Sequence, residues 1–406
     1  MSPLVGIAGF AIAGALAAGA AFDGVATYHD GLRPLMPEYR RGEMERADLG
    51  RRGWAMSAGF VRWFALPFIL VSGVGVSHAV FLPTDIVGLR SARRALALLV
   101  GGVVGLLAGA LVLVVDFLPA DLTNTWLEMA EPLRYLIILL PVVAALEYRG
   151  LAAAVLVSLI VVALRITVTI STVGVDPDAM ALLGGTLACL IIALRERVPA
   201  PERPEVLSHN LYAARRSLIY LTPLGAVVGA LAYGGFLAGE PGAALLLGAD
   251  LRWAAASVAI FSGVAFIPSV TRSVAVSGSA STQGSPDWVL AVGFLAPSYW
   301  AAALGGAAAL SAEVLGAPLL LRLVDRHPKL SVMGVAMRHA LVVVFDLAVL
   351  IGGAMVAHAL LPGFGLATVV GLFIWNEAKG RPLMPIAVGA LGAIAAGIVE
   401  YLLETF

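Results

Sequence analysis

Apolar runs of about 20 residues recur along the whole chain, and this feature restricts the fold more than any other. Each run is long enough to cross roughly 30 Å of hydrocarbon as a helix. Of the 406 residues, 60% are hydrophobic and 13% are charged, against about 25% charged in soluble domains. The sequence therefore predicts an all-α polytopic membrane protein in contact with membrane lipids. The runs lie near residues 3–27, 54–72, 95–116, 132–147, 151–172, 179–194, 217–239, 251–272, 288–321, 330–361, 365–379 and 383–403.

Basic residues are confined to alternate connections, and this pattern predicts the orientation of the spans. Lys and Arg near span ends are retained on the cytoplasmic side. The basic connections lie near 29–53, 90–94, 195–216, 322–329 and 379–381, and those without basic residues near 117–131, 173–178, 240–250, 280–287 and 362–364. The N-terminus is therefore predicted outside. Lys+Arg and Asp+Glu are equal at 26 each, so the net charge indicates no nucleic-acid partner.

Two segments do not fit simple spans and predict re-entrant hairpins. The segment 54–90 has basic residues at both ends but holds only one full span, so we expect it to turn near 72–75 and return through 81–85. The segment 251–287 has two flanks poor in basic residues, with expected breaks at 266–269 and 277–285. Non-helical backbone at membrane depth is tolerated only where protein buries it or where it lines a wet cavity.

The two hairpins divide the chain into two halves of opposite orientation. We expect a first inverted repeat at 1–200, a cytoplasmic linker at 201–216 and a second repeat at 217–406, each with about five transmembrane helices plus its hairpin. Ser72-Gly73-Val74 resembles Ser262-Gly263-Val264, and Phe81-Leu82-Pro83-Thr84 resembles Phe266-Ile267-Pro268-Ser269, although the spacings differ. Inverted-topology repeats are how many secondary transporters expose one midplane site alternately to each side, so the pattern favours an elevator-type transporter architecture.

Ionisable groups in the first hairpin supply candidate ligands. A charged side chain inside a span costs at least about 2.5 kcal/mol on insertion scales, so it needs a partner, a wet cavity or a function. Asp85 follows Pro83 in the expected broken helix, beside freed carbonyls and a new helix N-terminus. Thr84 and Asp85 therefore either bind the substrate or a coupling ion, Na⁺ or H⁺, or cap the returning half-helix.

The second hairpin and the span after it supply a second set of candidates. Ser269, Thr271 and Arg272 follow Pro268, and an arginine there suits bidentate capture of a carboxylate or phosphate. The alternative for Arg272 is an intramembrane ion pair with Asp85 or Glu313. Glu313 lies well inside a long apolar stretch and is a candidate carboxylate for the coupling ion, with a structural ion pair as the alternative. For Arg338, near the end of its span, snorkelling to the interface is favoured.

Other chemistry is mostly excluded by the absence of its motifs. The chain has no GxxxxGK[ST] phosphate loop, no GxSxG and no HExxH, and its histidines are dispersed without ligand spacing. One cysteine, Cys189, excludes an intramolecular disulfide and a CxxC pair. We therefore expect no enzyme activity, no metal site and no cofactor.

Several motifs along the chain resemble one family. They are Tyr28-His29-Asp30-Gly31-Leu32-Arg33-Pro34, Phe81-Leu82-Pro83-Thr84-Asp85-Ile86-Val87-Gly88, Ser311-Ala312-Glu313-Val314-Leu315 and Asn376-Glu377-Ala378-Lys379-Gly380-Arg381-Pro382. In order and spacing they resemble the YhfT family of bacterial inner-membrane proteins over nearly the whole chain. The resemblance implies a transporter of unestablished substrate in the bacterial inner membrane. It also draws attention to His29, Asp30 and Arg33 as a gate, and to Asn376 and Glu377 on the substrate path; helix-terminating turns are the alternative for both groups.

Together these features predict a secondary transporter that moves a small polar or anionic solute by an elevator-like alternating-access mechanism. We expect it to work as a homodimer. The architecture also looks like the ascorbate-type membrane components of sugar phosphotransferase systems. One alternative is therefore a membrane component that needs a cytosolic partner, docked on the 195–216 connection. Another alternative is a membrane-embedded enzyme that uses His29 and Asp30 at the interface.

Overall fold

Long apolar helices dominate the computed structural model, as the sequence predicts. The structure describes residues 2–28, 32, 35, 38–39, 42–61, 65–66, 69, 73–114, 128, 131–171, 174–195, 197, 215–239, 252–277, 280–281, 285–380 and 385–405. Across these residues the secondary structure is helical apart from four two-residue strands. Seven of the described helices are long and apolar enough to cross a membrane. The chain is therefore a multi-pass membrane protein.

Four helices from the first half pack into one group. They are α1 (Pro3–Phe22), α3 (Arg46–Phe60), α5 (Ser77–Arg90) and α6 (Arg94–Val114), and α1 packs along both α5 and α6. A Cβ atom on Gly14 would lie 2.3 Å from the Gly101 carbonyl oxygen, and one on Gly88 would lie 2.3 Å from the Ala18 carbonyl oxygen. Glycine is required at these positions because the helix backbones touch, which is typical of membrane helix packing.

Four helices from the second half pack in a matching way. They are α12 (Leu218–Tyr233), α14 (Arg252–Ser277), α15 (Ser285–Leu295) and α16 (Tyr299–Arg326), and α12 packs along both α15 and α16. A Cβ atom on Gly225 would lie 2.3 Å from the Gly306 carbonyl oxygen, and one on Gly293 would lie 2.6 Å from the Gly229 carbonyl oxygen. The second group thus uses the same kind of backbone contact at its two main helix pairs.

The first helix of each group ends in the same cap. Gly24 follows α1 with φ 65°, and Gly235 follows α12 with φ 74°. In both caps the glycine N–H and the next N–H donate back into the last turn, to Ala21 and Ala20 after α1 and to Ala232 and Leu231 after α12. This is the Schellman arrangement, which favours glycine because its φ is positive. A two-residue strand follows each cap, β1 (Ala26–Thr27) and β3 (Leu237–Ala238).

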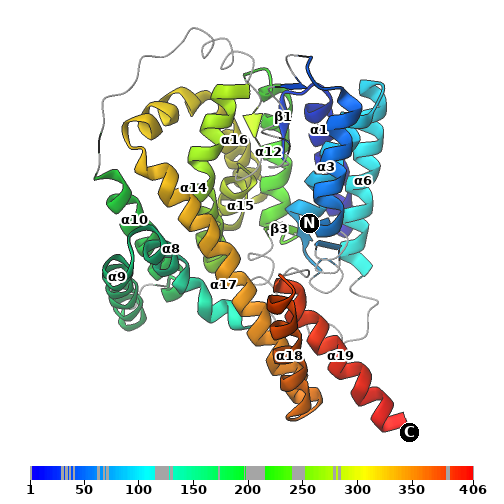
Figure 1. The fold of residues 1–406 in the computed structure, drawn as a ribbon. Helices are drawn as coiled ribbons and strands as arrows, with labels where there is room; N and C mark the ends of the chain where they lie inside the picture. The colour runs from blue at the N-terminus through cyan, green and yellow to red at the C-terminus, as the bar shows by residue number, and fades with distance from the viewer. Residues whose placement is uncertain are drawn as a thin grey trace.

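The short strands join the two groups crosswise. Strand β1 pairs in parallel with β4 (Ala280–Ser281), which lies between α14 and α15. Strand β2 (Gly75–Val76), directly before α5, pairs in parallel with β3. In Figure 1, β1 lies at the upper end of the helix groups and β3 at the lower end, so α1 and α12 run in opposite directions. Each half therefore contributes one strand to each pair.

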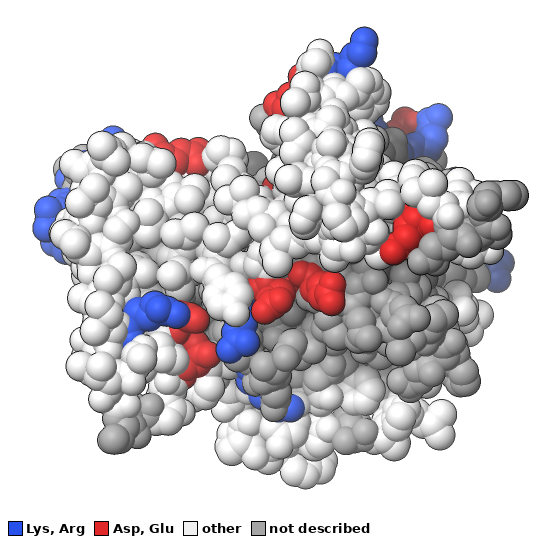
Figure 2. Space-filling model, turned by 90° about the horizontal axis from the view of Figure 1, so that it is seen from below, with Lys and Arg blue, Asp and Glu red and all other residues white. Residues whose placement is uncertain are grey.

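The remaining helices form a lower layer beside these groups (Figure 1). They are η4 (Ile137–Leu139), α8 (Leu140–Arg149), α9 (Leu151–Ile170), α10 (Pro177–Leu194), α17 (Lys329–Leu360), α18 (Phe364–Ala378) and α19 (Pro385–Thr405). The long helix α17 links this layer to the rest, since it packs on α8, α18, α19 and α14. Seen from below, the molecule is mostly uncharged, with scattered charged residues (Figure 2).

The hairpins differ from the sequence prediction in where their helices break. The helix α5 runs through Pro83 and α14 runs through Pro268, so the expected breaks at 81–85 and 266–269 are wrong. The Thr84 hydroxyl donates to the carbonyls of Val80 and Phe81, 3.0 and 3.1 Å away, and such contacts help a membrane helix accommodate a proline. The non-helical backbone lies at strands β2 and β4, in or beside the stretches 72–75 and 277–285, where the sequence also predicts interruptions.

The start of α3 and the end of α5 lie at the same end of the molecule. The helix α3 begins at Arg46, inside the stretch that the sequence marks as polar. The Arg46 guanidinium donates to the carbonyls of Leu89 and Gly88 at the end of α5, at 2.8 and 3.0 Å. The start of α3 therefore lies beside the end of α5, as a hairpin requires.

Candidate functional site

Buried polar side chains gather where α5 passes strand β1. Thr27, Ser77, Thr84 and Asp85 are all buried, and Asp85 is only 1% exposed. The backbone N–H of Tyr28 donates a hydrogen bond to Oδ2 of Asp85, with 2.6 Å between the two atoms. A carboxylate at this depth is stabilised by such a charge-assisted bond from the backbone.

The Tyr28 side chain extends the cluster along α5. Its phenol oxygen lies 3.0 Å from Oγ of Ser77 and 3.3 Å from Nδ1 of His78. The rings of Tyr28 and His78 meet edge to face with centroids 5.1 Å apart. His78 and Asp85 are seven residues apart, so they share one face of the helix. Tyr28, Ser77, His78 and Asp85 are called the Asp85 cluster below.

Sequence reasoning found Thr84 and Asp85 but missed the other members of this cluster. The sequence marks Tyr28 only as part of a motif and His78 only as one of several dispersed histidines. The available signal was the helical spacing of Ser77, His78 and Asp85 in an otherwise apolar segment. The contact with Tyr28 depends on tertiary structure, because the residues are 49 or more positions apart in the sequence.

Thr271 and Glu313 line a second location, a cavity between α14, α15 and α16. Its volume is about 300 Å³, and its aromatic walls are Phe266 and Trp288. The Thr271 hydroxyl donates to the Ile267 carbonyl at 2.7 Å. The structure therefore brings together two of the residues that the sequence marks as binding groups.

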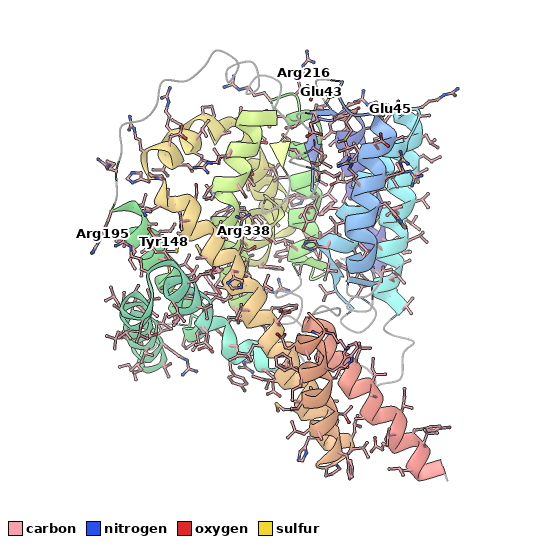
Figure 3. The ribbon with its side chains drawn as sticks, viewed as in Figure 1. Glu43, Glu45, Tyr148, Arg195, Arg216 and Arg338 are labelled. Carbon is pink, nitrogen blue, oxygen red and sulfur yellow. The ribbon has the colours of Figure 1, made fainter. Side chains whose placement is uncertain are left out.

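Arg338 lies close to this cavity, on α17. Its guanidinium carbon is 5.4 Å from the centroid of the Phe266 ring, a cation–π contact between α17 and α14. Figure 3 shows Arg338 at mid-height of the molecule, below the upper end where Glu43, Glu45 and Arg216 lie. The sequence predicts that Arg338 extends to the membrane interface, and it does not predict this contact with Phe266.

The other predicted site residues that the structure describes neither belong to the Asp85 cluster nor line the cavity. Ser269 is partly buried and donates to the Phe266 carbonyl at 2.9 Å, whereas Arg272 is exposed. On α18, Asn376 is fully buried and Glu377 is exposed. The gate candidates His29, Asp30 and Arg33 lie outside the described residues.

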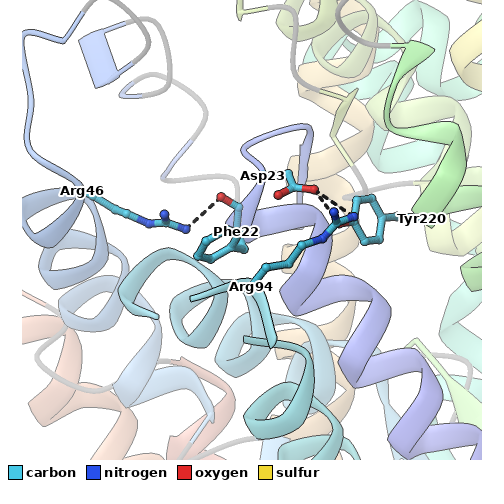
Figure 4. A network of polar contacts seen from close by, with 5 residues as sticks. All are labelled: Phe22, Asp23, Arg46, Arg94 and Tyr220. Carbon is cyan, nitrogen blue, oxygen red and sulfur yellow. Dashed lines mark hydrogen bonds and ion pairs between the residues drawn. The ribbon is translucent and has the colours of Figure 1, made fainter. Parts of the chain in front are cut away.

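A third polar network joins four helix ends (Figure 4). The Tyr220 hydroxyl donates to Oδ2 of Asp23 at 2.5 Å, and an Arg94 guanidinium nitrogen lies 3.4 Å from the same oxygen. Arg94 also donates to the Tyr220 hydroxyl. Nearby, Arg46 donates to the Phe22 carbonyl at 2.8 Å and lies over the Phe22 ring. These contacts join the end of α1 to the starts of α3, α6 and α12, so the network stabilises the packing.

The chemistry available at the Asp85 cluster is binding and proton exchange. A carboxylate, two hydroxyls and an imidazole offer several hydrogen bonds to a small polar molecule. Among the described residues, no group of three or more His, Cys, Asp or Glu side chains is arranged to hold a metal ion.

Comparisons with known proteins assign the family but no activity. The model of the YhfT family, described as a protein of unknown function, matches residues 7–406. The chain is also similar to the uncharacterized protein YhfT of Escherichia coli (strain K12), with 25% identity over 397 residues that cover 92% of this chain and 91% of the relative. No solved structure matches. The chain therefore belongs to the YhfT family.

Proposed function

We propose that the chain is a secondary transporter built from two inverted repeats, which moves a small polar solute by elevator-like alternating access. The observation that carries this proposal is the crossed pairing of the strands, β1 with β4 and β2 with β3, between helix groups whose first helices run in opposite directions. Two inverted repeats give a protein two related conformations, each open to one side.

The residue positions at the packing contacts support the repeat. The shift along the sequence that takes Gly14 to Gly225 also takes the cap glycine Gly24 to Gly235 and the strand residue Ala26 to Leu237. A second shift, from Gly88 to Gly293, also takes Gly101 to Gly306 and Gly75 to Ala280. Two constant shifts relate helix contacts, caps and strand register, and unrelated halves have no physical reason to share them.

We place the solute and the coupling ion at the Asp85 cluster. An ionisable residue buried in a membrane protein is a functional-site hypothesis by default, because its burial is costly without a role. The hydroxyls and imidazole beside Asp85 suit a polar solute, and the carboxylate suits Na⁺ or H⁺ as the coupling ion. An anionic solute would need a nearby cation, and the candidate for that role, Arg272, is exposed. A neutral polar solute is therefore favoured over an anionic one.

The elevator motion is proposed between the two helix groups and the lower layer. The contact between Arg338 on α17 and Phe266 on α14 lies on this boundary, and a homodimer would hold the lower layer still. The hairpins and the Asp85 cluster would then move together.

Uptake into proteoliposomes tests the proposal, after a thermal-shift screen of polar metabolites has found a stabilising solute. We expect Asp85→Asn to abolish uptake of that solute and to leave the protein folded. Asp48→Asn is the matched control, because Asp48 pairs with Arg51 on an exposed surface, and it should transport at the wild-type rate. Wild-type uptake by Asp85→Asn would remove this carboxylate from the mechanism.

A further inference from the structure

A largely apolar cavity beside Glu313 is separate from the Asp85 cluster. The cavity of about 300 Å³ between α14, α15 and α16 adjoins a second hollow of about 490 Å³, and both are lined by Trp288 and Val292. Ligand pockets in proteins are typically about 300–1,000 Å³, mostly apolar, with a few placed polar groups. The two hollows together have this size and character.

Among the described residues that line either hollow, Glu313 is the one charged group. It lies near the middle of the 28-residue helix α16, far from either end. Of the described lining residues, the only other one with an oxygen in its side chain is Thr271. The remaining walls are carbon, apart from the indole N–H of Trp288. A ligand there would meet one carboxylate within an apolar and aromatic surface.

The lining discriminates between classes of ligand. A metal cation such as Ca²⁺ takes about six to eight oxygen ligands, far more than two side chains supply. An anion would face the Glu313 carboxylate, since Arg338 is not a lining residue. An organic cation fits both features, because aromatic faces attract ammonium groups and its carbon body gains free energy on leaving water. The ring of Phe266, which lines the cavity, already makes one cation–π contact, with the guanidinium group of Arg338.

We propose that this cavity binds an organic cation, with its ammonium group beside Glu313 and its apolar body against Trp288 and Phe266. The proposal goes beyond transport through the Asp85 cluster. Its test is a binding measurement without transport, so either proposal can fail while the other stands.

Isothermal titration calorimetry of the purified full chain in a nonionic detergent, with benzyltrimethylammonium as the probe, measures this binding. We expect one site per chain and no binding of phenylacetate, which has a similar ring but a negative charge. Glu313→Gln should weaken binding of the cation at least tenfold, because it removes the charge and keeps the shape. Glu45→Gln, at an exposed glutamate directly before α3, should bind as the wild type does.

A second variant tests the cavity itself and keeps the proposal falsifiable if Glu313→Gln is unstable. Ala309 lines the cavity, so Ala309→Phe should fill it and abolish binding while the carboxylate remains. The proposal is overturned if both variants bind the cation like the wild type. It is also overturned if phenylacetate binds equally well, or if the heat equals that of empty micelles.

Discussion

Replacing Gly14 by alanine tests whether α1 and α6 touch backbone to backbone, and Gly225→Ala tests the same contact between α12 and α16. In both variants the new Cβ would lie 2.3 Å from a carbonyl oxygen, where ordinary contacts begin at 3.4 Å. Each helix pair must therefore open by about 1 Å, which forfeits a quarter to a half of the dispersion attraction at neighbouring contacts. Overpacking costs about 1–3 kcal/mol, and a backbone carbonyl cannot rotate away. We expect a loss near about 3 kcal/mol in each variant.

Thermal unfolding in detergent, followed by tryptophan fluorescence, measures these losses. At about 2 °C per kcal/mol for a long chain, each variant should unfold about 6 °C below the wild type. Gly316→Ala is the control, because a Cβ there meets nothing within 4 Å and alanine favours the helix by about 0.5–1 kcal/mol. If Gly14→Ala is as stable as this control, the close contact does not exist. If Gly14→Ala and Gly225→Ala differ by more than about 1 kcal/mol, the two contacts are not equivalent.

Three further variants address the polar contacts. Arg46→Gln should lower stability by about 2 kcal/mol in the same assay, because charged hydrogen bonds to three carbonyls are lost. Tyr220→Phe should cost about 1 kcal/mol, since the ion pair between Arg94 and Asp23 remains; an unchanged midpoint would contradict this. Tyr28→Phe keeps the backbone bond to Asp85 but loses the phenol contact with His78. It should therefore change the pH profile of solute uptake, and an unaltered profile would exclude a role for that contact.

The general architecture could be predicted from the sequence because it depends on composition and on the distribution of charge. Basic residues at both ends of 54–90 predict the first hairpin, and the hydrogen bond from Arg46 to Leu89 brings the start of α3 beside the end of α5. The breaks that rest on proline, at 81–85 and 266–269, are wrong, whereas the glycine- and serine-rich stretches 72–75 and 277–285 do mark interruptions of the helices. Hydroxyl groups of Thr84 and Thr271 donate to carbonyls near each proline and the helices continue, a local effect that hydropathy does not report.

The alignment of the two halves could not be predicted for a different reason. Sequence comparison matched Phe81-Leu82-Pro83-Thr84 with Phe266-Ile267-Pro268-Ser269, but the first motif lies on α5 and the second on α14. The contacts that relate the halves are glycines against backbone, and a chain with 45 glycines offers many false matches. Only the three-dimensional contacts select the pair Gly88 and Gly293. The Asp85 cluster was incomplete for the same reason, since Tyr28 reaches α5 only in the folded chain.

The proposed repeat also accounts for the position of the Asp85 cluster on the first half alone. In the register that relates Gly88 to Gly293, Asp85 corresponds to Leu290, which is fully buried. In the register that relates Gly24 to Gly235, Tyr28 corresponds to Gly239, and a Cβ there would lie 3.6 Å from Oδ1 of Asp287. Close backbone contact constrains both halves equally, so the glycines are shared. A single solute needs only one set of ligands, so the residues of the second half that correspond to the Asp85 cluster need not be polar. There a carboxylate, that of Asp287, lies beside Gly239, the residue that follows strand β3.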